Sequence, residues 1–195
     1  MRVVLATGNA HKAAELRPLL PGARVDTAPA GFDPEETGTT LLQNALIKAR
    51  ALRPEADPGA VVVADDTGLA VHALDGRPGV YSARYAGPGA TFDDNCRLLL
   101  QEMRGVRDRR AAFVCVLVAL HADGDMALGC GVLPGRITEE PRGERGFGYD
   151  PVFVPEGDER SLAELTTEEK NALSHRGRAA RRLAAVLGLD GEPEG

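Results

Sequence analysis

The sequence predicts an α/β fold with a mixed sheet, and three observations carry this prediction. In the first half of the chain, short apolar segments typical of buried strands alternate with segments of helical periodicity. In the middle, Asp123-Gly124 is a hairpin signal between two further strand-like segments. No repeat, linker or low-complexity segment divides the 195 residues, so we expect one domain over 1–195, with a frayed tail over 190–195.

The elements follow from local patterns, taken in chain order. Apolar runs predict strands, Pro and Gly end helices, and a Ser, Thr or Asn before an apolar-periodic segment begins one. The first half is predicted to contain a strand over 2–6, a turn at 7–9, a helix over 10–20, a polar loop over 29–40, a helix over 41–52 and a strand beginning at 61. The second half is predicted to contain a loop over 76–90, a helix from Thr91 to about 103, strands over 111–121 and 126–133, a glycine-rich loop over 143–148, and a helix from 166 or 167 to 187 that pauses between 174 and 177.

Composition excludes several classes of protein. A net charge of −6 argues against a surface that follows nucleic-acid phosphates. The three cysteines are far apart, without a CxxC spacing, which indicates reduced thiols rather than a zinc site or a disulfide framework. The longest apolar run, 111–120, is too short to span a bilayer, and the first residues do not resemble a signal peptide. We therefore expect a cytoplasmic protein with neither nucleic acid nor membrane as partner.

The scarcity of lysine marks three positions. Of the 23 basic residues, only Lys12, Lys48 and Lys170 are lysine. A solvated cation can usually be either type, so a position that keeps lysine can be one that needs a compact ammonium. The alternative is chance.

The stretch LATGNAHK, residues 5–12, joins a strand through a turn to a helix. Free backbone N–H groups at such a junction favour an anion, and a bound phosphate would offset the unfavourable position of Lys12 in the first helical turn. GxxxxGK[ST] is absent, so this is no Walker A loop. The alternative is that Asn9 only caps the helix and that Lys12 points into water.

The stretch VVVADDTGLAV, residues 61–71, runs four apolar residues into two aspartates. Side chains alternate along a strand, so Asp65 and Asp66 should point apart, one toward a cleft and one supporting a Thr-Gly turn. Carboxylates at a strand end suit a hard divalent cation, and Glu35 and Glu36 offer two more on a loop. The alternative is turn and capping chemistry.

Two later stretches are candidates for binding a flat ring. In GERGFGYD, residues 143–150, Phe147 and Tyr149 could stack on a base and Asp150 could accept its hydrogen bonds; the alternative is a turn closed by core aromatics. In EEKNALSHRGRAARR, residues 168–182, a helix break at Ser174 would bring together Lys170, His175 and Arg176. The alternative there is a solvated basic face.

These stretches, in this order, resemble the inosine triphosphate pyrophosphatase family, the XTP/dITP diphosphatases. The resemblance covers about residues 3–180, through ATGNAHK, EETGTTLLQNALIKAR, ADDTGLAV with GRPGVYSARYAG, GFGYDPVF and AELTTEEKNALSHRG. It implies an elongated mixed sheet flanked by helices, with two lobes around an active-site cleft. It also implies a Mg²⁺-dependent homodimer that hydrolyses ITP, dITP and XTP to the monophosphate and pyrophosphate, by water attack on the α-phosphate, and so cleanses the nucleotide pool.

The resemblance also implies roles for residues that match its motifs. Asp66 would be the general base and a metal ligand, with Glu35 as the other metal carboxylate. The remaining residues would bind substrate: Thr7, Gly8, Asn9, Ala10, His11, Lys12 and Lys48 on the phosphate side, Thr67, and Phe147, Gly148, Tyr149, Asp150, Lys170, His175 and Arg176 around the base and sugar.

One position departs from the family pattern, because Gln43 stands where a glutamate is usual; it is therefore left out of the metal set. Two other functions are compatible with a nucleotide pocket. One is a pyrophosphatase for modified pyrimidine nucleotides, against which the GFGYD and SHRG motifs argue. The other is a non-catalytic nucleotide sensor, against which Asp66 and the EETG carboxylates argue.

Overall fold

The computed structural model describes residues 1–189, so the tail predicted to fray, 190–195, lies outside the described residues. Strands and helices alternate early and a hairpin follows, as predicted. In chain order the elements are β1 (Arg2–Leu5), α1 (Ala10–Leu16), β2 (Arg24–Thr27), α2 (Leu41–Leu52), β3 (Ala60–Val71), β4 (Pro78–Gly79), α3 (Phe92–Glu102), β5 (Arg110–Leu120), β6 (Met126–Ile137), β7 (Phe153–Pro155), α4 (Thr167–Leu173) and α5 (His175–Val186).

The strands form one mixed sheet of seven strands, which confirms the predicted fold class. Its order is β2-β1-β3-β5-β6-β7, with β4 added on β3. The strand β1 pairs in parallel with β2 and β3, whereas β4 and β7 run antiparallel to β3 and β6. Parallel pairs need crossover segments, and α1 and α2 provide them.

The chain divides into two compact units. Unit 1 comprises Met1–Asp66, Cys115–Gly131 and the described chain from His175 onward; unit 2 comprises Thr67–Val114 and Val132–Ser174. The cleft between two lobes that the resemblance implies stays a prediction.

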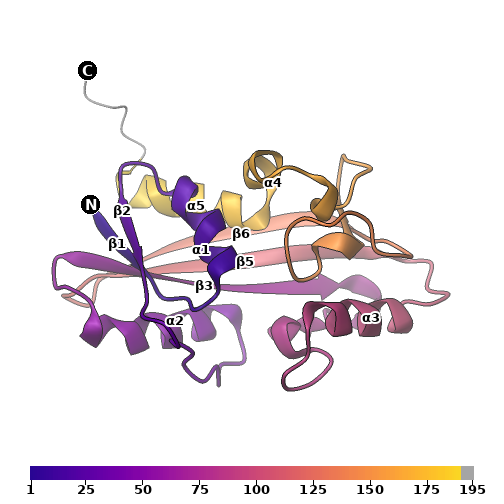
Figure 1. The fold of residues 1–195 in the computed structure, drawn as a ribbon, viewed down its shortest axis with the longest axis horizontal. Coiled ribbons are helices and arrows are strands. Elements are labelled where there is room, and N and C mark those ends of the chain that lie inside the picture. Colours follow the sequence, from indigo (N-terminus) through magenta and orange to yellow (C-terminus); the bar gives the residue numbers. More distant parts are fainter. Residues whose placement is uncertain (190–195) are drawn as a thin grey trace. The chain divides into compact units, whose positions relative to one another are not determined.

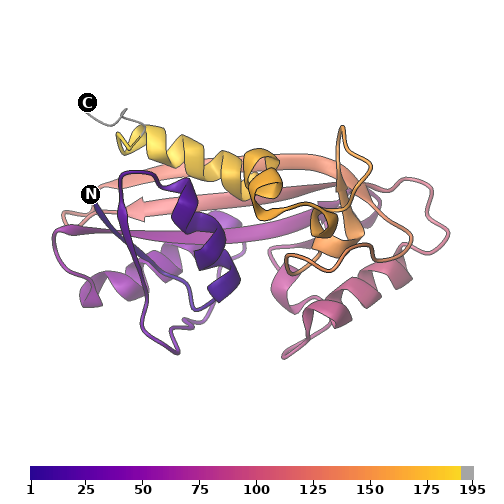
Figure 2. The ribbon, with the colours of Figure 1, turned by 45° about the horizontal axis from the view of Figure 1, so that its top comes forward.

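In unit 1 the two faces of the sheet carry different helices, as Figure 1 and the turned view of Figure 2 show. Val61 and Val63 pack with residues of α1 and α5 on one face. Val62 and Ala64 pack with residues of α2 on the other face. Because side chains alternate along a strand, this pattern assigns every following residue of β3 in unit 1 to one face or the other.

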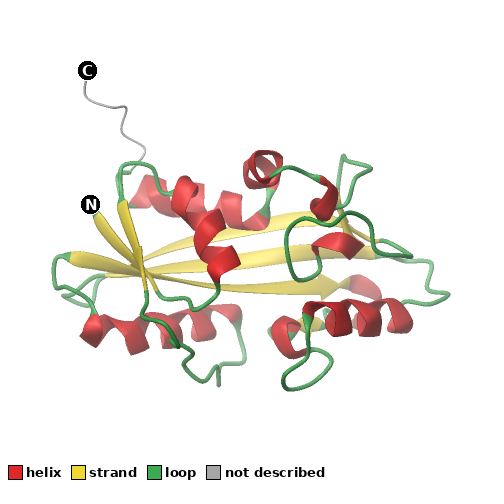
Figure 3. Ribbon diagram, viewed as in Figure 1, coloured by secondary structure: helices red, strands yellow, loops and turns green. Residues whose placement is uncertain are grey.

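Unit 2 has its own core, which collects residues from β3, α3, β5, β6 and β7 and from the segment before α4. Between β6 and α4 the chain is mostly loop with short helical turns, shown in green and red in Figure 3. Among these loops lies the glycine-rich stretch 143–148.

The structure corrects the sequence prediction at several elements. No turn occurs at Thr67-Gly68, because β3 continues through both residues to Val71. The strands β2, β4 and β7 were not predicted, since four, two and three residues are too short for a periodic signal. Helix α1 ends at Leu16 and a 3-10 turn with Pro18 follows, while β6 extends beyond 133 to Ile137.

No helix within 1–189 is long and apolar enough to cross a membrane.

Candidate active site

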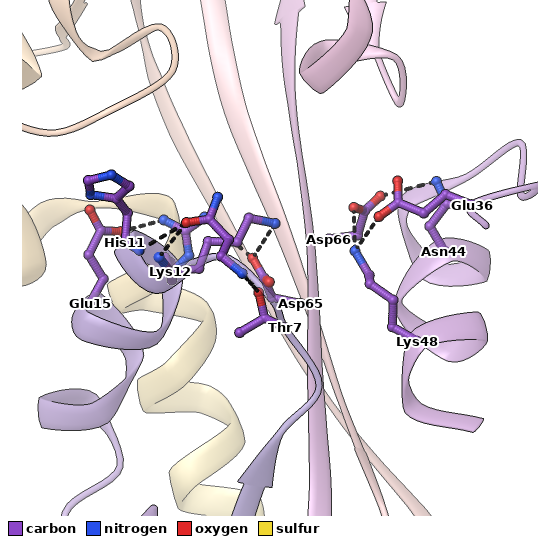
Figure 4. Close-up of polar contacts among 11 residues, drawn as sticks. Thr7, His11, Lys12, Glu15, Glu36, Asn44, Lys48, Asp65 and Asp66 are labelled. Carbon is purple, nitrogen blue, oxygen red and sulfur yellow. Dashed lines mark hydrogen bonds and ion pairs between the residues drawn. The ribbon is translucent and has the colours of Figure 1, made fainter. Parts of the chain in front are cut away.

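The adjacent aspartates of β3 lie on opposite faces of the sheet, as Figure 4 shows. Both are buried, with exposed fractions of 2% for Asp65 and 5% for Asp66. The alternation that places Val63 on one face and Ala64 on the other continues through them. The prediction that they point apart is confirmed, and each carboxylate has its own set of cations.

Asp65 faces α1 and α5, where two cations surround it. Lys12 Nζ lies 3.1 Å from Asp65 Oδ2, and Arg176 Nη2 donates to the same oxygen at 3.4 Å. Arg176 is also paired with Glu15, which is buried on α1. Burial alone would raise the pKa of Asp65, but Lys12, Arg176 and Lys48 together hold it well below its usual range. Asp65 is therefore held in its charged form by its partners, and the turn that it was predicted to support is absent.

Asp66 faces α2, where one ammonium serves two carboxylates. Lys48 Nζ donates to Asp66 Oδ1 at 2.9 Å and to Glu36 Oε1 at 2.8 Å, and Asn44 Nδ2 donates to Asp66 Oδ2 at 3.4 Å. Burial raises the pKa of Asp66, and the attraction of Lys48 offsets that effect only in part. The pKa of Lys48 rises to about 12, because Asp65, Asp66 and Glu36 outweigh the opposing effect of its burial. The carboxylate of Asp66 is thus the more basic of the two.

The sequence of α2 explains why these partners meet Asp66. Asn44 and Lys48 are four residues apart, so they share the buried face of the helix with Ala45 and Ala49. Sequence analysis missed Asn44, although its place beside apolar residues at this spacing is a readable signal.

Gln43 helps to cap the start of α2 and is not one of the groups around Asp66. Its Oε1 accepts from Thr39 N at 2.7 Å and from Thr40 N at 3.2 Å, while Thr40 Oγ1 accepts from Gln43 N, which makes a capping box. An amide oxygen serves this purpose as a carboxylate would. The departure from the family pattern therefore leaves the helix start intact.

In the stretch over 5–12 only one half of the structural alternative is correct, and phosphate binding stays a prediction. Asn9 Oδ1 accepts from His11 N at 2.9 Å and from Lys12 N at 3.2 Å, so Asn9 does cap α1. Lys12, however, does not point into water, because it is paired with Asp65. Gly8 has a packing reason, since a Cβ there would lie 2.6 Å from the backbone oxygen of Phe32.

Two carboxylates near Asp66 were candidates for holding a metal ion. Glu35 is exposed, and it is Glu36 that shares Lys48 with Asp66. Within residues 1–189 no group of three or more His, Cys, Asp or Glu side chains is arranged to hold a metal. Asp66 and Glu36 are hard oxygen donors, and Mg²⁺ in nucleotide sites is bound by one or two carboxylates plus substrate phosphates. This donor set fits Mg²⁺, with Glu36 in the place expected for Glu35.

In unit 2, Asp150 holds the glycine-rich loop together. Its Oδ2 accepts from Phe147 N at 2.8 Å and from Lys170 Nζ at 2.5 Å. Lys170 Nζ also lies 5.0 Å from the centroid of the Phe147 ring. Asp150 is 3% exposed, and in this structure it positions Phe147 and Lys170; its contact with substrate stays a prediction.

Tyr149 is a core residue. Its ring is buried in the core of unit 2 and its hydroxyl donates to Ser82 O at 2.8 Å. The stacking expected of Tyr149 is therefore not available to its ring, and the alternative of a core aromatic is correct for this position. Phe147 and Gly148 are half-buried.

The helix break at Ser174 is present as predicted, between α4 and α5. Lys170 pairs with Asp150 in unit 2, and Arg176 pairs with Glu15 and Asp65 in unit 1. His175 is buried. Their shared base and sugar pocket stays a prediction, as does the substrate contact of Thr67, which is half-buried on β3.

A cavity of about 1320 Å³ in unit 2 contains none of the predicted site residues. It is lined by residues of α3 and of the segments 103–109 and 139–143, with Pro151. Its charged lining is mixed in sign, with four arginines against Asp93, Glu139 and Glu140. The predicted chemistry therefore lies elsewhere.

Comparison with known proteins identifies the family. A family model described as the Ham1 family matches residues 3–186. The chain is 49% identical over 195 residues to a protein of Escherichia coli K12 named dITP/XTP pyrophosphatase, covering 95% of this chain and 98% of that one. It is 48% identical to a Deinococcus deserti protein of the same name, covering 95% and 88%.

Solved structures agree. The Ham1 protein of Staphylococcus aureus superposes with a TM-score of 0.85 at 36% identity, covering 98% of this chain and all of that one. A structure from Mycobacterium abscessus, titled nucleoside-triphosphatase / dITP/XTP pyrophosphatase, has a TM-score of 0.72 at 43% identity, covering 96% and 99%. The motifs, the fold and these matches agree, and the chain is a member of the Ham1 family.

Proposed function

We propose that this protein is a pyrophosphatase that hydrolyses noncanonical purine nucleoside triphosphates, namely dITP, ITP and XTP, to the monophosphate and pyrophosphate. The observation that carries the proposal is the environment of Asp66, a buried carboxylate of raised pKa beside a lysine and a second carboxylate. The names of relatives at nearly half identity support the substrate class.

Asp66 is the general base in this proposal. A carboxylate whose pKa is raised by burial accepts a proton more readily than an ordinary one, and Lys48 beside it favours its charged form. It takes a proton from the water that attacks the α-phosphorus. The bond from that phosphorus to the bridging oxygen breaks, and the β- and γ-phosphates leave as pyrophosphate.

Asp66 and Glu36 would hold Mg²⁺. In this proposal Glu36 takes the metal-binding role that the resemblance implies for Glu35. The ion would supply charge neutralisation for the triphosphate and for the departing pyrophosphate. Lys48, which already contacts both carboxylates, keeps their combined negative charge from repelling the substrate.

The stretch Thr7–Lys12 would bind the triphosphate through Lys12 and backbone groups. Because Asp65 of β3 is fixed by Arg176 in a buried network, the side chain of Lys12 on α1 is held at a defined place beside it. In unit 2, the Phe147 ring would stack on the base, and Lys170 would donate to the oxygen at purine position 6. The resemblance further suggests a homodimer, which elution volume and light scattering test directly.

The experiment is a substrate panel. Pyrophosphate release is measured with and without Mg²⁺ from ITP, dITP, XTP, GTP, ATP and dTTP, with orthophosphate monitored in parallel and no auxiliary pyrophosphatase present. We expect Mg²⁺-dependent pyrophosphate from the first three and little from the others.

Each other outcome changes the conclusion in a defined way. Release of orthophosphate without pyrophosphate would show that a bond other than the one at the α-phosphorus is hydrolysed. Release from modified pyrimidine nucleotides instead would favour the related pyrimidine activity. Tight nucleotide binding without any product would favour a sensor.

A further inference from the structure

Phe92 is an aromatic residue that the core does not use. It is the first residue of α3 and is 43% exposed, and it is absent from the buried core of unit 2. The helix start that carries it is firmly built, because Thr91 and Asp94 form a capping box. An exposed ring of this size on a fixed backbone is available to contact a ligand.

The ring of Phe92 lies beside that of Phe147. Their centroids are 5.8 Å apart and their planes are inclined by 45°, a distance within the range of interacting aromatic pairs. Both residues belong to unit 2, although they come from a helix and from the glycine-rich loop. The chain has only five Phe and three Tyr, so this one surface uses a quarter of its aromatic residues.

A second contact aligns α3 with the same loop. Cys96 is four residues after Phe92 and therefore on the same side of the helix. Its thiol donates to Gly148 O at 3.3 Å, directly after Phe147 in the chain. Phe92 and Cys96, one turn apart on α3, thus contact Phe147 and Gly148, which are adjacent in the loop. These two contacts fix the position of Phe92 relative to Phe147.

We propose that Phe92 contacts the purine base as the second ring of a two-ring platform with Phe147. The inference rests on the proposed function, because it assigns a further residue to the base site. A purine has two fused rings and extends beyond a single phenyl ring, so a neighbouring apolar ring adds contact area that one phenylalanine cannot supply. Since stacking is made equally before and during bond cleavage, Phe92 should affect substrate binding and leave the chemical step alone.

The first test is kinetic. Phe92→Ala should raise the KM for ITP about fivefold or more and leave kcat within about twofold, the size expected for losing one aromatic contact with a base. Phe92→Tyr and Phe92→Trp keep a flat ring and should restore the KM, whereas Phe92→Leu keeps apolar bulk without a ring and should not. If Phe92 only supported the loop, the leucine variant would rescue. Met126→Ala, a truncation of a residue 52% exposed in unit 1, is the matched control.

The second test is optical and needs no turnover. The chain has no tryptophan, so Phe92→Trp introduces its only indole. In an Asp66→Asn background, which spares the ITP, titration with ITP should quench this fluorescence in a saturable way, because the base would stack on the indole. Met126→Trp in the same background should show no saturable quenching.

The two tests separate this inference from the function it rests on. If Phe147→Ala weakens ITP binding while Phe92→Ala behaves as wild type, the inference is overturned and the pyrophosphatase stands. If Phe92→Trp shows no saturable quenching although the wild type hydrolyses ITP, the inference is likewise overturned. If the wild type releases no pyrophosphate but the indole is quenched by ITP, the base contact stands and the catalytic function is lost.

Discussion

Asp65 and Asp66 are neighbours in sequence, are both buried, and differ in the direction of their pKa shifts. Asp65 has Lys12 and Arg176 at its carboxylate, and its pKa lies below the ordinary value. Asp66 shares one lysine with Glu36, and its pKa lies above the ordinary value. The backbone is the same extended strand at both residues, so the difference arises from the helices and the loop that face them.

The comparison distinguishes a carboxylate held by its partners, the structural one, from the carboxylate that we propose as the general base, the chemical one. Two cations around one buried carboxylate stabilise its charge, and such a group can neither accept a proton nor leave its partners at low cost. One cation divided between two carboxylates leaves negative charge in excess, which favours binding of a proton or a metal ion. Burial alone would not have distinguished the two residues.

The largest expected effect comes from removing the chemical carboxylate. Asp66→Asn should lower kcat by about 10²- to 10⁴-fold, the usual contribution of a positioned general base. The free energy of unfolding should change little, because an uncharged side chain suits a site that already disfavours ionisation. Pyrophosphate release and urea denaturation measure the two quantities. Near-normal turnover would remove Asp66 from its assigned role.

The same substitution at the neighbouring aspartate, Asp65→Asn, should lower the stability of the protein instead. Asp65→Asn leaves the buried Arg176 and the half-buried Lys12 beside a neutral group, which should lower the free energy of unfolding by about 3–5 kcal/mol. The pKa of Asp65 is depressed in the folded protein, so its contribution is present above the unfolded value of about 3.9 and is lost as pH falls through the folded value. The gap between variant and wild type should therefore close in strong acid. A gap that widened there would contradict the assignment.

Lys48, the cation that Asp66 shares with Glu36, should influence the pH dependence of kcat/KM. Lys48 lowers the pKa of Asp66, so Lys48→Met should raise that pKa further and move the acid limb of kcat/KM to higher pH. The base must be ionised to work, which fixes the sign. Lys48→Arg keeps the charge and should leave the limb near its original position. A limb that moved to lower pH in the methionine variant would exclude Asp66 as the titrating base.

The smallest effect concerns Gln43. It is next in sequence to Asn44, a partner of Asp66, but its own role is to cap the start of α2. Gln43→Ala should cost about 1 kcal/mol through loss of the capping box of α2, and Gln43→Glu should retain the cap. Neither substitution should change the Mg²⁺ concentration that gives half-maximal activity. A changed Mg²⁺ requirement in the alanine variant would assign Gln43 to the metal site after all.

Much of this arrangement could be read from the sequence, and the parts that could not have physical reasons. The long elements α2, α3, β5 and β6 have clear periodicity, and the opposed directions of Asp65 and Asp66 follow from strand geometry. The turn expected after Asp66 was wrong because Thr-Gly is compatible with an extended strand that tertiary pairing stabilises; β4 pairs with β3 just beyond it.

The contacts that the sequence failed to predict are mainly those between residues far apart in the chain. Nothing in the local sequence of Glu15 announces a pairing with Arg176, which is 161 residues away. The choice between Glu35 and Glu36 depends on which side chain a loop turns toward Lys48, and a loop has no periodicity to indicate it. The burial of the Tyr149 ring could not be predicted for a related reason, since nothing in the pattern of a loop indicates which of its aromatic rings enters the core.

The parallel pairing of β3 with β1, in which Val61 faces Val3 and Val63 faces Leu5, has a consequence for how such a gene can vary. Because faces alternate with every residue, deleting or inserting a single residue between 60 and 65 would exchange the surroundings of the two aspartates if the pairing of β3 with β1 were kept. Both carboxylates would survive in the sequence, and neither would meet its partners. A point substitution at either aspartate removes one function, whereas a one-residue change in length would remove two. We therefore expect random libraries of this strand to yield folded substitution variants and almost no folded length variants.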